Sequence, residues 1–121
     1  AEANRRTAVI PLVESSEGAA NFEKILRTPG ITAVFLGPVD LSVAMGLKGN
    51  VNAPEVRSAL LTMVEQANRA GIPVGALGLD PAFVRELFSR GLNFLAYGID
   101  TILMYQKCCE IQQAVFGRSA Q

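Results

Sequence analysis

The stretch PEVRSALLTMVEQANRAGIPVGAL, residues 54–77, decides the class of fold. It begins with a proline suited to the first turn of a helix, and its apolar residues recur at helical spacing, which predicts a helix over residues 54–70. Gly71 is placed to end that helix, and a short apolar run predicts a strand over residues 73–77. A helix that leads directly into a short apolar strand is typical of α/β proteins built on a parallel sheet.

The same alternation extends through the rest of the chain. Further strands are predicted over residues 8–13, 31–36 and 94–97, and further helices over residues 15–26, 81–90 and 99–116, with an irregular stretch at 39–53. The resulting βαβαβαβα order predicts a parallel sheet that is either half of an eight-stranded (β/α) barrel or a small open sheet. Because the strands are continuously apolar, we expect cover on both of their faces. Pro11 nevertheless counts against a central position for the first strand.

Two of the predicted helices begin with recognisable capping residues. Ser15 or Ser16 is suited to cap the helix over residues 15–26, with Glu17 in its first turn. Asp80 followed by Pro81 is an N-cap followed by a first-turn proline.

Composition and length exclude several classes of protein. The chain has 121 residues, of which 50% are hydrophobic and 18% charged, so it is not disordered and suits one compact unit. It is too short for a complete (β/α)₈ barrel, which needs about 250 residues. Eleven basic residues balance eleven acidic ones, so neither nucleic acid nor an anionic membrane is an expected partner. No apolar stretch approaches the roughly 20 residues of a membrane span.

The chain contains no histidine. A Ser-His or Cys-His nucleophile, an imidazole base and a histidine zinc ligand therefore cannot come from it. The two cysteines, Cys108 and Cys109, are adjacent and are expected to be reduced thiols that pack on a helix, as in a cytoplasmic protein. The polar start lacks an initiator methionine, and we expect it to be a cut or processed end.

Two carboxylates follow neighbouring strands. Ligands of parallel α/β proteins bind beyond the carboxyl ends of the strands, and Glu14 and Asp40 follow the first and second strands. Neighbouring strands lie about 4.8 Å apart, so both carboxylates are expected to reach one hard cation, Mg²⁺ or Mn²⁺. Alternatively, each carboxylate caps the helix that follows it, Asp40 preceding Leu41-Ser42. The residues alone leave both interpretations open.

The segment Gly37-Pro38-Val39-Asp40-Leu41-Ser42 is suited to hold an anion. Its glycine allows a ligand to approach the backbone, and amides that lead into a helical turn bind negative charge. A substrate carboxylate is thus expected against the amides of Val39 and Asp40 while Asp40 binds the metal. A simple turn between strand and helix is the alternative.

Three segments together resemble the HpcH/HpaI family of class II pyruvate aldolases. They are Val13-Glu14-Ser15, the Gly37–Ser42 segment with Gly46 beyond it, and Tyr97-Gly98-Ile99-Asp100-Thr101. The separation of Glu14 and Asp40 also matches that of the two metal-binding carboxylates of the family. The resemblance extends over roughly residues 8–116 and implies strands five to eight, the C-terminal half, of a (β/α)₈ barrel. It makes residues 1–121 a single partial domain.

The resemblance implies an activity and a set of site residues. Glu14 and Asp40 would bind a divalent cation (Mg²⁺, Mn²⁺ or Co²⁺), which acts as a Lewis acid for the pyruvate enolate. The reaction would be reversible cleavage of 4-hydroxy-2-oxo acids to pyruvate or a related 2-oxo acid and an aldehyde. The substrate would lie against Gly37, Pro38 and the amides of Val39 and Asp40, and Leu77 would line the pocket.

This sequence departs from the family at one position and lacks part of its machinery. Leu12 stands where family members often have a glutamine that contacts the substrate. The catalytic histidine and the arginine that clamps the substrate carboxylate belong to the N-terminal half-barrel, and neither Arg5 nor Arg6 matches that arginine. No catalytic residue is therefore assigned within this chain, which is expected to need the missing half-barrel as a partner and to be inactive alone.

The predicted helix over residues 99–116 is apolar around much of its surface, which is expected if it packs against a neighbour. The resemblance suggests that this helix is exchanged between subunits of a homo-oligomer, and simple core packing is the alternative. The open edges of a half-barrel also predict self-association or poor solubility of the chain alone.

Two other functions remain open at this point. A citrate-lyase β-type lyase would use an equivalent Glu and Asp to cleave acyl-CoA thioesters. A non-catalytic α/β assembly module would use Glu14 and Asp40 only as helix caps.

Overall fold

The computed structural model describes residues 2–117, without the side chains of Asn4 and Arg5. Its elements in chain order are α1 (Glu2–Arg6), β1 (Leu12–Val13), α2 (Ser16–Ala20), α3 (Phe22–Leu26), β2 (Val34–Leu36), α4 (Pro38–Ala44), α5 (Pro54–Arg69), β3 (Val74–Gly78), α6 (Pro81–Ser89), β4 (Phe94–Tyr97) and α7 (Asp100–Phe116). The strand and helix predicted over residues 94–97 and 54–70 agree with β4 and α5 to within one residue.

The four strands form one parallel sheet in the order β1-β2-β3-β4. Every strand therefore lies beside the next one in the sequence. That is the order of strands around a (β/α) barrel, whereas a doubly wound open sheet reverses its order at a switch point. All four carboxyl ends consequently meet at one edge of the sheet, which we call the rim.

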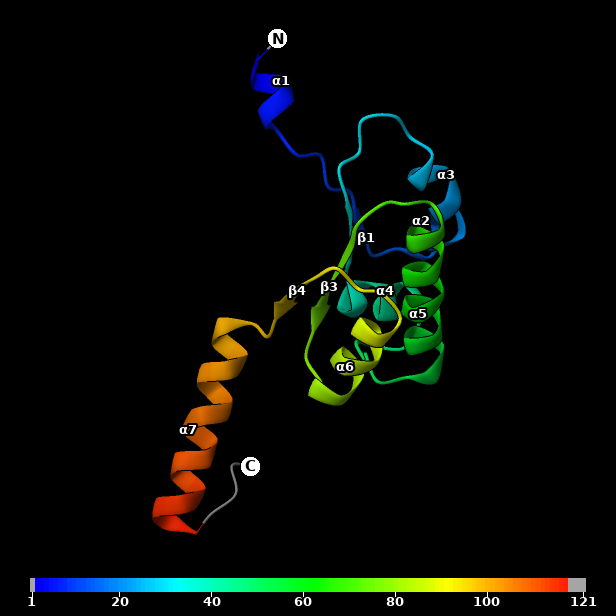
Figure 1. Ribbon diagram of the computed structural model, residues 1–121. Helices are drawn as coiled ribbons and strands as arrows, with labels where there is room; N and C mark the ends of the chain where they lie inside the picture. The colour runs from blue at the N-terminus through cyan, green and yellow to red at the C-terminus, as the bar shows by residue number, and fades with distance from the viewer. Residues whose placement is uncertain (1, 118–121) are drawn as a thin grey trace.

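The core lies between one face of the sheet and the helices that cover it, as Figure 1 shows for α2, α3, α5 and α6. The long helix α5 turns its apolar stripe toward the sheet. The buried residues of this stripe are Val56, Leu60, Met63, Val64 and Ala67. They pack with Val34, Leu36, Val74 and Ala76 of the two central strands. Helix and strands thus cannot bury their apolar side chains without each other.

The opposite face of the sheet is less well covered, which corrects the expectation of cover on both faces. Val9, Ile10 and Leu12 are exposed, and Leu12 keeps 52% of its accessible surface. Side chains alternate between the two faces of a strand, so Val13 enters the core while Leu12 faces away from it. This face, which we call the uncovered face, is therefore less well covered than the face toward α5 within residues 2–117.

The first strand is also shorter than predicted. Hydrogen bonds from Thr32, Phe35 and Gly37 to the carbonyls of residues 9, 11 and 13 still align the segment with β2. Pro11 has no amide hydrogen to return such a bond, so regular pairing begins only at Leu12.

Four of the described helices differ from the prediction. No helix is predicted over residues 2–6, where α1 forms. The helix expected over residues 15–26 is interrupted at Asn21 and forms α2 and α3. The stretch at 39–53, expected to be irregular, contributes most of α4, because Pro38 occupies the first turn of a helix.

The C-terminal helix α7 corrects a further expectation. It contains no buried residue, and Figure 1 shows it running away from the sheet, so packing in the core of this chain is wrong as an explanation of its apolar surface. Its exposed apolar residues are Ile102, Leu103, Met104, Tyr105, Ile111, Val115 and Phe116.

Of the two free cysteines of α7, Cys108 is exposed and Cys109 half-buried. Within residues 2–117, no helix combines the length and hydropathy that crossing a membrane requires.

The uncovered face holds one tight packing arrangement. Leu12, Phe35, Gly75 and Phe94 form one row across the four strands. The rings of Phe35 and Phe94 lie 5.8 Å apart between centroids, and a methyl group on Gly75 would collide with the Phe94 ring. Gly75 thus leaves the space that the ring of Phe94 occupies.

We therefore expect Gly75→Ala to destabilise the chain by about 1–3 kcal/mol, because the added methyl group forces the Phe94 ring to move. Urea unfolding monitored by circular dichroism measures this cost. In a Phe94→Ala background the methyl group has room, so the added cost of Gly75→Ala should largely disappear. An equal cost in both backgrounds would contradict the explanation.

Candidate functional site

Glu14 leaves β1 at the rim and lies directly over the backbone of Gly37. The amide of Gly37 donates to the carbonyl of Val13 at 3.0 Å, which brings Glu14 beside Gly37. A Cβ atom on Gly37 would lie 2.9 Å from Cβ and 3.1 Å from Oε2 of Glu14. Gly37 has φ −100°, a value open to any residue, so its role is to leave space rather than to allow a special conformation.

Asp40 lies in the first turn of α4, three residues beyond Gly37. Gly37 holds the N-cap position and Pro38 the first helical position, which makes Asp40 the third helical residue. The side chain of Asp40 is exposed. The first bond of the helix runs from the amide of Leu41 to the carbonyl of Gly37 at 3.1 Å. The amides of Val39 and Asp40 precede that bond and point out of the amino end of the helix.

The structure corrects the alternative in which both carboxylates cap helices. The cap of α2 is Ser15, whose hydroxyl accepts from the amide of Gly18 at 3.0 Å, and the cap position of α4 belongs to Gly37. Among the residues that the structure describes, neither Glu14 nor Asp40 takes part in an ion pair. The capping role that would make them purely structural is thus filled by other residues.

Two serines tie the corners that carry these carboxylates. Ser16 at the start of α2 donates to the carbonyl of Ala44 at the end of α4, at 2.9 Å. Fully buried Ser42 donates to the carbonyl of Val39 at 2.6 Å. The rim ends of β1 and β2 are therefore linked both through the sheet and through these helices.

Residues 2–117 contain no group of three or more His, Cys, Asp or Glu that could hold a metal by itself.

The end of β3 adds Leu77 to the same rim. Half-buried Leu77 and buried Pro38 line one cavity of about 10 Å³, together with Val51, Asn52 and Phe83. That volume holds about one water molecule and is too small for a substrate. The structure thus places Leu77 beside Pro38.

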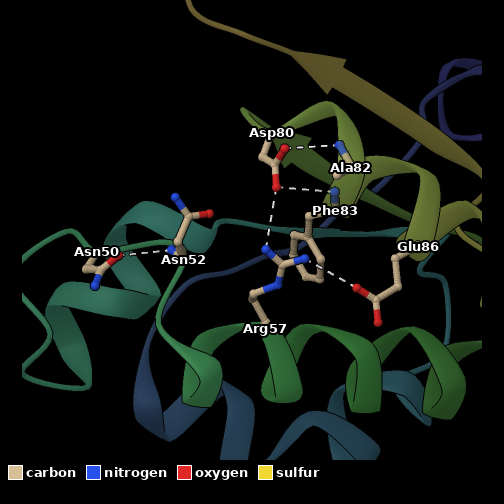
Figure 2. Close-up of polar contacts among 7 residues, drawn as sticks. All are labelled: Asn50, Asn52, Arg57, Asp80, Ala82, Phe83 and Glu86. Carbon is tan, nitrogen blue, oxygen red and sulfur yellow. Dashed lines mark hydrogen bonds and ion pairs between the residues drawn. The ribbon is translucent and has the colours of Figure 1, made fainter.

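Beside this cavity lies a charged cluster that the sequence did not predict as a unit (Figure 2). Arg57 on α5 reaches Oδ2 of Asp80 at 3.4 Å and Oε2 of Glu86 at 3.3 Å. Its guanidinium carbon lies 4.0 Å from the centre of the Phe83 ring. Asp80 is the N-cap of α6, as predicted, and accepts from the amides of Ala82 and Phe83 at 3.0 and 3.3 Å. The partners of Arg57 are 23 and 29 residues away, so local sequence patterns carry no signal for them.

These hydrogen bonds change the acidity of Asp80. The amide of Ala82 is the main cause that lowers the pKa of the Asp80 carboxyl below its usual value, and burial opposes it. The amide of Phe83 and the charge of Arg57 lower the pKa further. Because the lowered pKa belongs to the folded state, the ionised carboxylate stabilises the fold above a pH of about 4. This contribution is lost as the pH falls through the lowered pKa.

The sequence matches a known protein family. The model of the HpcH/HpaI aldolase/citrate lyase family matches residues 1–106. The chain belongs to this family. The predicted fold class, four βα units that match half of a (β/α)₈ barrel, is confirmed by the parallel sheet and by the solved structures it resembles.

Individual relatives agree with this assignment. The 2-keto-3-deoxy-L-rhamnonate aldolase of Salmonella paratyphi B is 35% identical over 116 residues, which cover 96% of this chain and 43% of the relative. The HpcH/HpaI aldolase of Desulfitobacterium hafniense DCB-2 has a TM-score of 0.83 at 23% identity, covering 94% of this chain and 44% of the other. An HpcH/HpaI family protein of Burkholderia cenocepacia J2315 has a TM-score of 0.78 at 30% identity, covering 93% and 44%. The chain thus spans less than half the length of these relatives.

The lowered pKa of Asp80 predicts a pH dependence of stability. Between about pH 5 and about pH 2 the parent should lose stability more steeply than Asp80→Asn, because asparagine also caps helices but does not titrate. Urea unfolding at a series of pH values measures the two slopes. Asp80→Ala is the matched control: it should have the shallow slope of Asp80→Asn and lower stability throughout. A variant slope equal to that of the parent would contradict the assignment.

Proposed function

We propose that this chain forms the C-terminal half of a divalent-metal-dependent aldolase. The enzyme cleaves 4-hydroxy-2-oxo acids reversibly to pyruvate or a related 2-oxo acid and an aldehyde. The observation that carries the proposal is the rim of β1 and β2. There the Glu14 carboxylate lies over Gly37, Asp40 follows in the first turn of α4, and other residues fill the cap positions of both helices.

The rim suits a hard cation such as Mg²⁺ or Mn²⁺. Carboxylate oxygens are the ligands these ions prefer, and a two-carboxylate site leaves positions for water and substrate. A side chain at residue 37 would fill the space where the Glu14 carboxylate lies, so Gly37 keeps this donor at the rim. When bound there by Glu14 and Asp40, the cation supplies Lewis-acid polarisation of the keto group of the substrate.

The other rim residues position the substrate. The amides of Val39 and Asp40 donate to its carboxylate, at the end of the helix where the dipole favours negative charge. Gly37 and Pro38 border that position, and Leu77 forms an apolar wall next to Pro38. Leu12 lies 3.4 Å from the Cβ position of Gly37 and so borders the same space as Glu14.

Other parts of the enzyme provide the catalytic groups that this chain lacks. The base and the cationic clamp come from an N-terminal half-barrel, so the chain alone is inactive. That half-barrel also covers the sheet face on which Leu12 is exposed. The apolar surface of α7 is covered by another subunit of a homo-oligomer.

The metal site is tested in a complete barrel that contains this chain. Glu14→Gln and Asp40→Asn should each weaken Mn²⁺ binding more than about tenfold, since even outer partners of metal ligands contribute about 10- to 100-fold. Paramagnetic resonance of free Mn²⁺ during titration measures the affinity. Glu17→Gln, which removes an exposed carboxylate from the first turn of α2, is the control and should bind as the parent does. Parental affinity in both site variants would end the metal assignment.

The class of substrate is tested by assaying the same enzyme for two reactions. The same barrel with Mn²⁺ should cleave a 4-hydroxy-2-oxo acid and leave malyl-CoA and citramalyl-CoA intact, with pyruvate or CoA release as the measurement. Acyl-CoA cleavage without keto-acid cleavage would instead support a citrate-lyase type of enzyme, the other activity named by the family.

A further inference from the structure

We propose that Arg57 is a positioning residue for substrate binding, which acts by fixing the corner between β3 and α6. This inference rests on the proposed function, because it concerns the same rim. Arg57 itself does not reach the rim carboxylates Glu14 and Asp40. It acts through Asp80 and Phe83, which adjoin the walls formed by Leu77 and Pro38.

Arg57 holds three groups of the corner at once. Its two terminal nitrogens bind Asp80 and Glu86 at 3.4 and 3.3 Å, and its planar face lies over the Phe83 ring at 4.0 Å. The side chain keeps 29% of its exposure, so solvent screens these charges less than at an open surface. A guanidinium can make all three contacts in one rotamer, whereas an ammonium is a single point of charge without a flat face.

Asp80 transmits this restraint to the end of β3. It follows Gly78, the last residue of the strand, by two positions, and it accepts hydrogen bonds from Ala82, Phe83 and Arg57. The amides of α6 and Arg57 of α5 both hold the carboxylate of Asp80. The backbone between residues 78 and 80 therefore has little freedom to shift. Arg57 and the cap of α6 therefore fix the same two-residue corner.

Phe83 transmits the restraint to the substrate-binding segment. Its ring is buried beneath Arg57 and lines the cavity of about 10 Å³ that Leu77 and Pro38 also line. Room for about one water molecule is too little to absorb a displaced ring, because packed interiors transmit strain. A shift of Phe83 would therefore move Pro38 at the start of α4, whose amides hold the substrate carboxylate in the proposed site.

A second ion pair provides a matched control. Arg90, which follows α6, pairs with Glu65 on α5, so it joins the same two helices as Arg57 does. It lies at the opposite end of these helices from Asp80 and does not line the cavity. Removing it should loosen the contact of α5 with α6 without moving the rim.

The experiment uses the complete Mn²⁺-loaded barrel and compares Arg57→Met, Arg57→Lys and Arg90→Met. We expect Arg57→Met to raise the KM for the 4-hydroxy-2-oxo acid about tenfold with kcat within about twofold of the parent. The displaced amides of α4 would hold the substrate carboxylate less well in both ground and transition state. Arg57→Lys should recover part of the loss. Arg90→Met should keep the parental KM, and all variants should keep the parental Mn²⁺ affinity because none touches Glu14 or Asp40.

Several results would overturn the positioning role. One such result is a parental KM in Arg57→Met. Another is the same rise in KM in Arg90→Met, because it would mean that any loosening of α6 raises the KM. If Arg57→Met does not fold, Asp80→Asn replaces it, because it keeps the helix cap and removes the charge that Arg57 binds; a parental KM there also overturns the role. A parent that cleaves the keto acid, with unaffected variants, refutes only the role of Arg57. A parent without that activity refutes the proposed function and this inference together.

Discussion

Parallel pairing of four strands in chain order is the constraint on which the rest of this structure depends. Because parallel strands can be joined only by crossovers, each strand is followed by helical structure, and all four carboxyl ends arrive at one rim. The apolar stripe of α5 makes this arrangement favourable, since it is buried only when β2 and β3 lie beneath it. Glu14, Gly37 and Leu77 reach the same rim for this reason, although they are far apart in sequence.

In the proposed enzyme, the residues that begin the helices at the rim differ from those that bind metal. Ser15 caps α2, Gly37 is the N-cap residue of α4, and Asp80 caps α6, so neither Glu14 nor Asp40 holds a cap position. A glycine at the N-cap of α4 offers no side chain to that helix, but it gives the Glu14 carboxylate the space it occupies. Hydrogen bonds from Ser42 to Val39 and from Ser16 to Ala44 stabilise the backbone beside the two carboxylates.

The apolar surface that this chain leaves exposed has the same origin as its site. A sheet of four strands in barrel order has one face turned toward the helices and another toward the strands of the opposite half. Leu12 on that second face and the apolar residues of α7 are exposed within residues 2–117. In the proposed enzyme they are interfaces, which would explain why α7 has no buried residue in a chain with 50% hydrophobic residues.

The sequence by itself determined the order of the four strands, the stripe of α5, the Asp80 cap and the family, because these depend on residues close together in the chain. It also named Glu14 and Asp40, but it could not tell whether they cap helices, since that depends on the residue at which each helix begins. Tertiary structure decided that Gly37 lies against Glu14, that Leu12 is exposed, and that Arg57 joins Asp80 to Glu86. The two contacts connect residues more than twenty positions apart. Pairing of β1 with β2 brings Glu14 to Gly37, and the packing of α5 and α6 on the sheet brings Arg57 to Asp80 and Glu86.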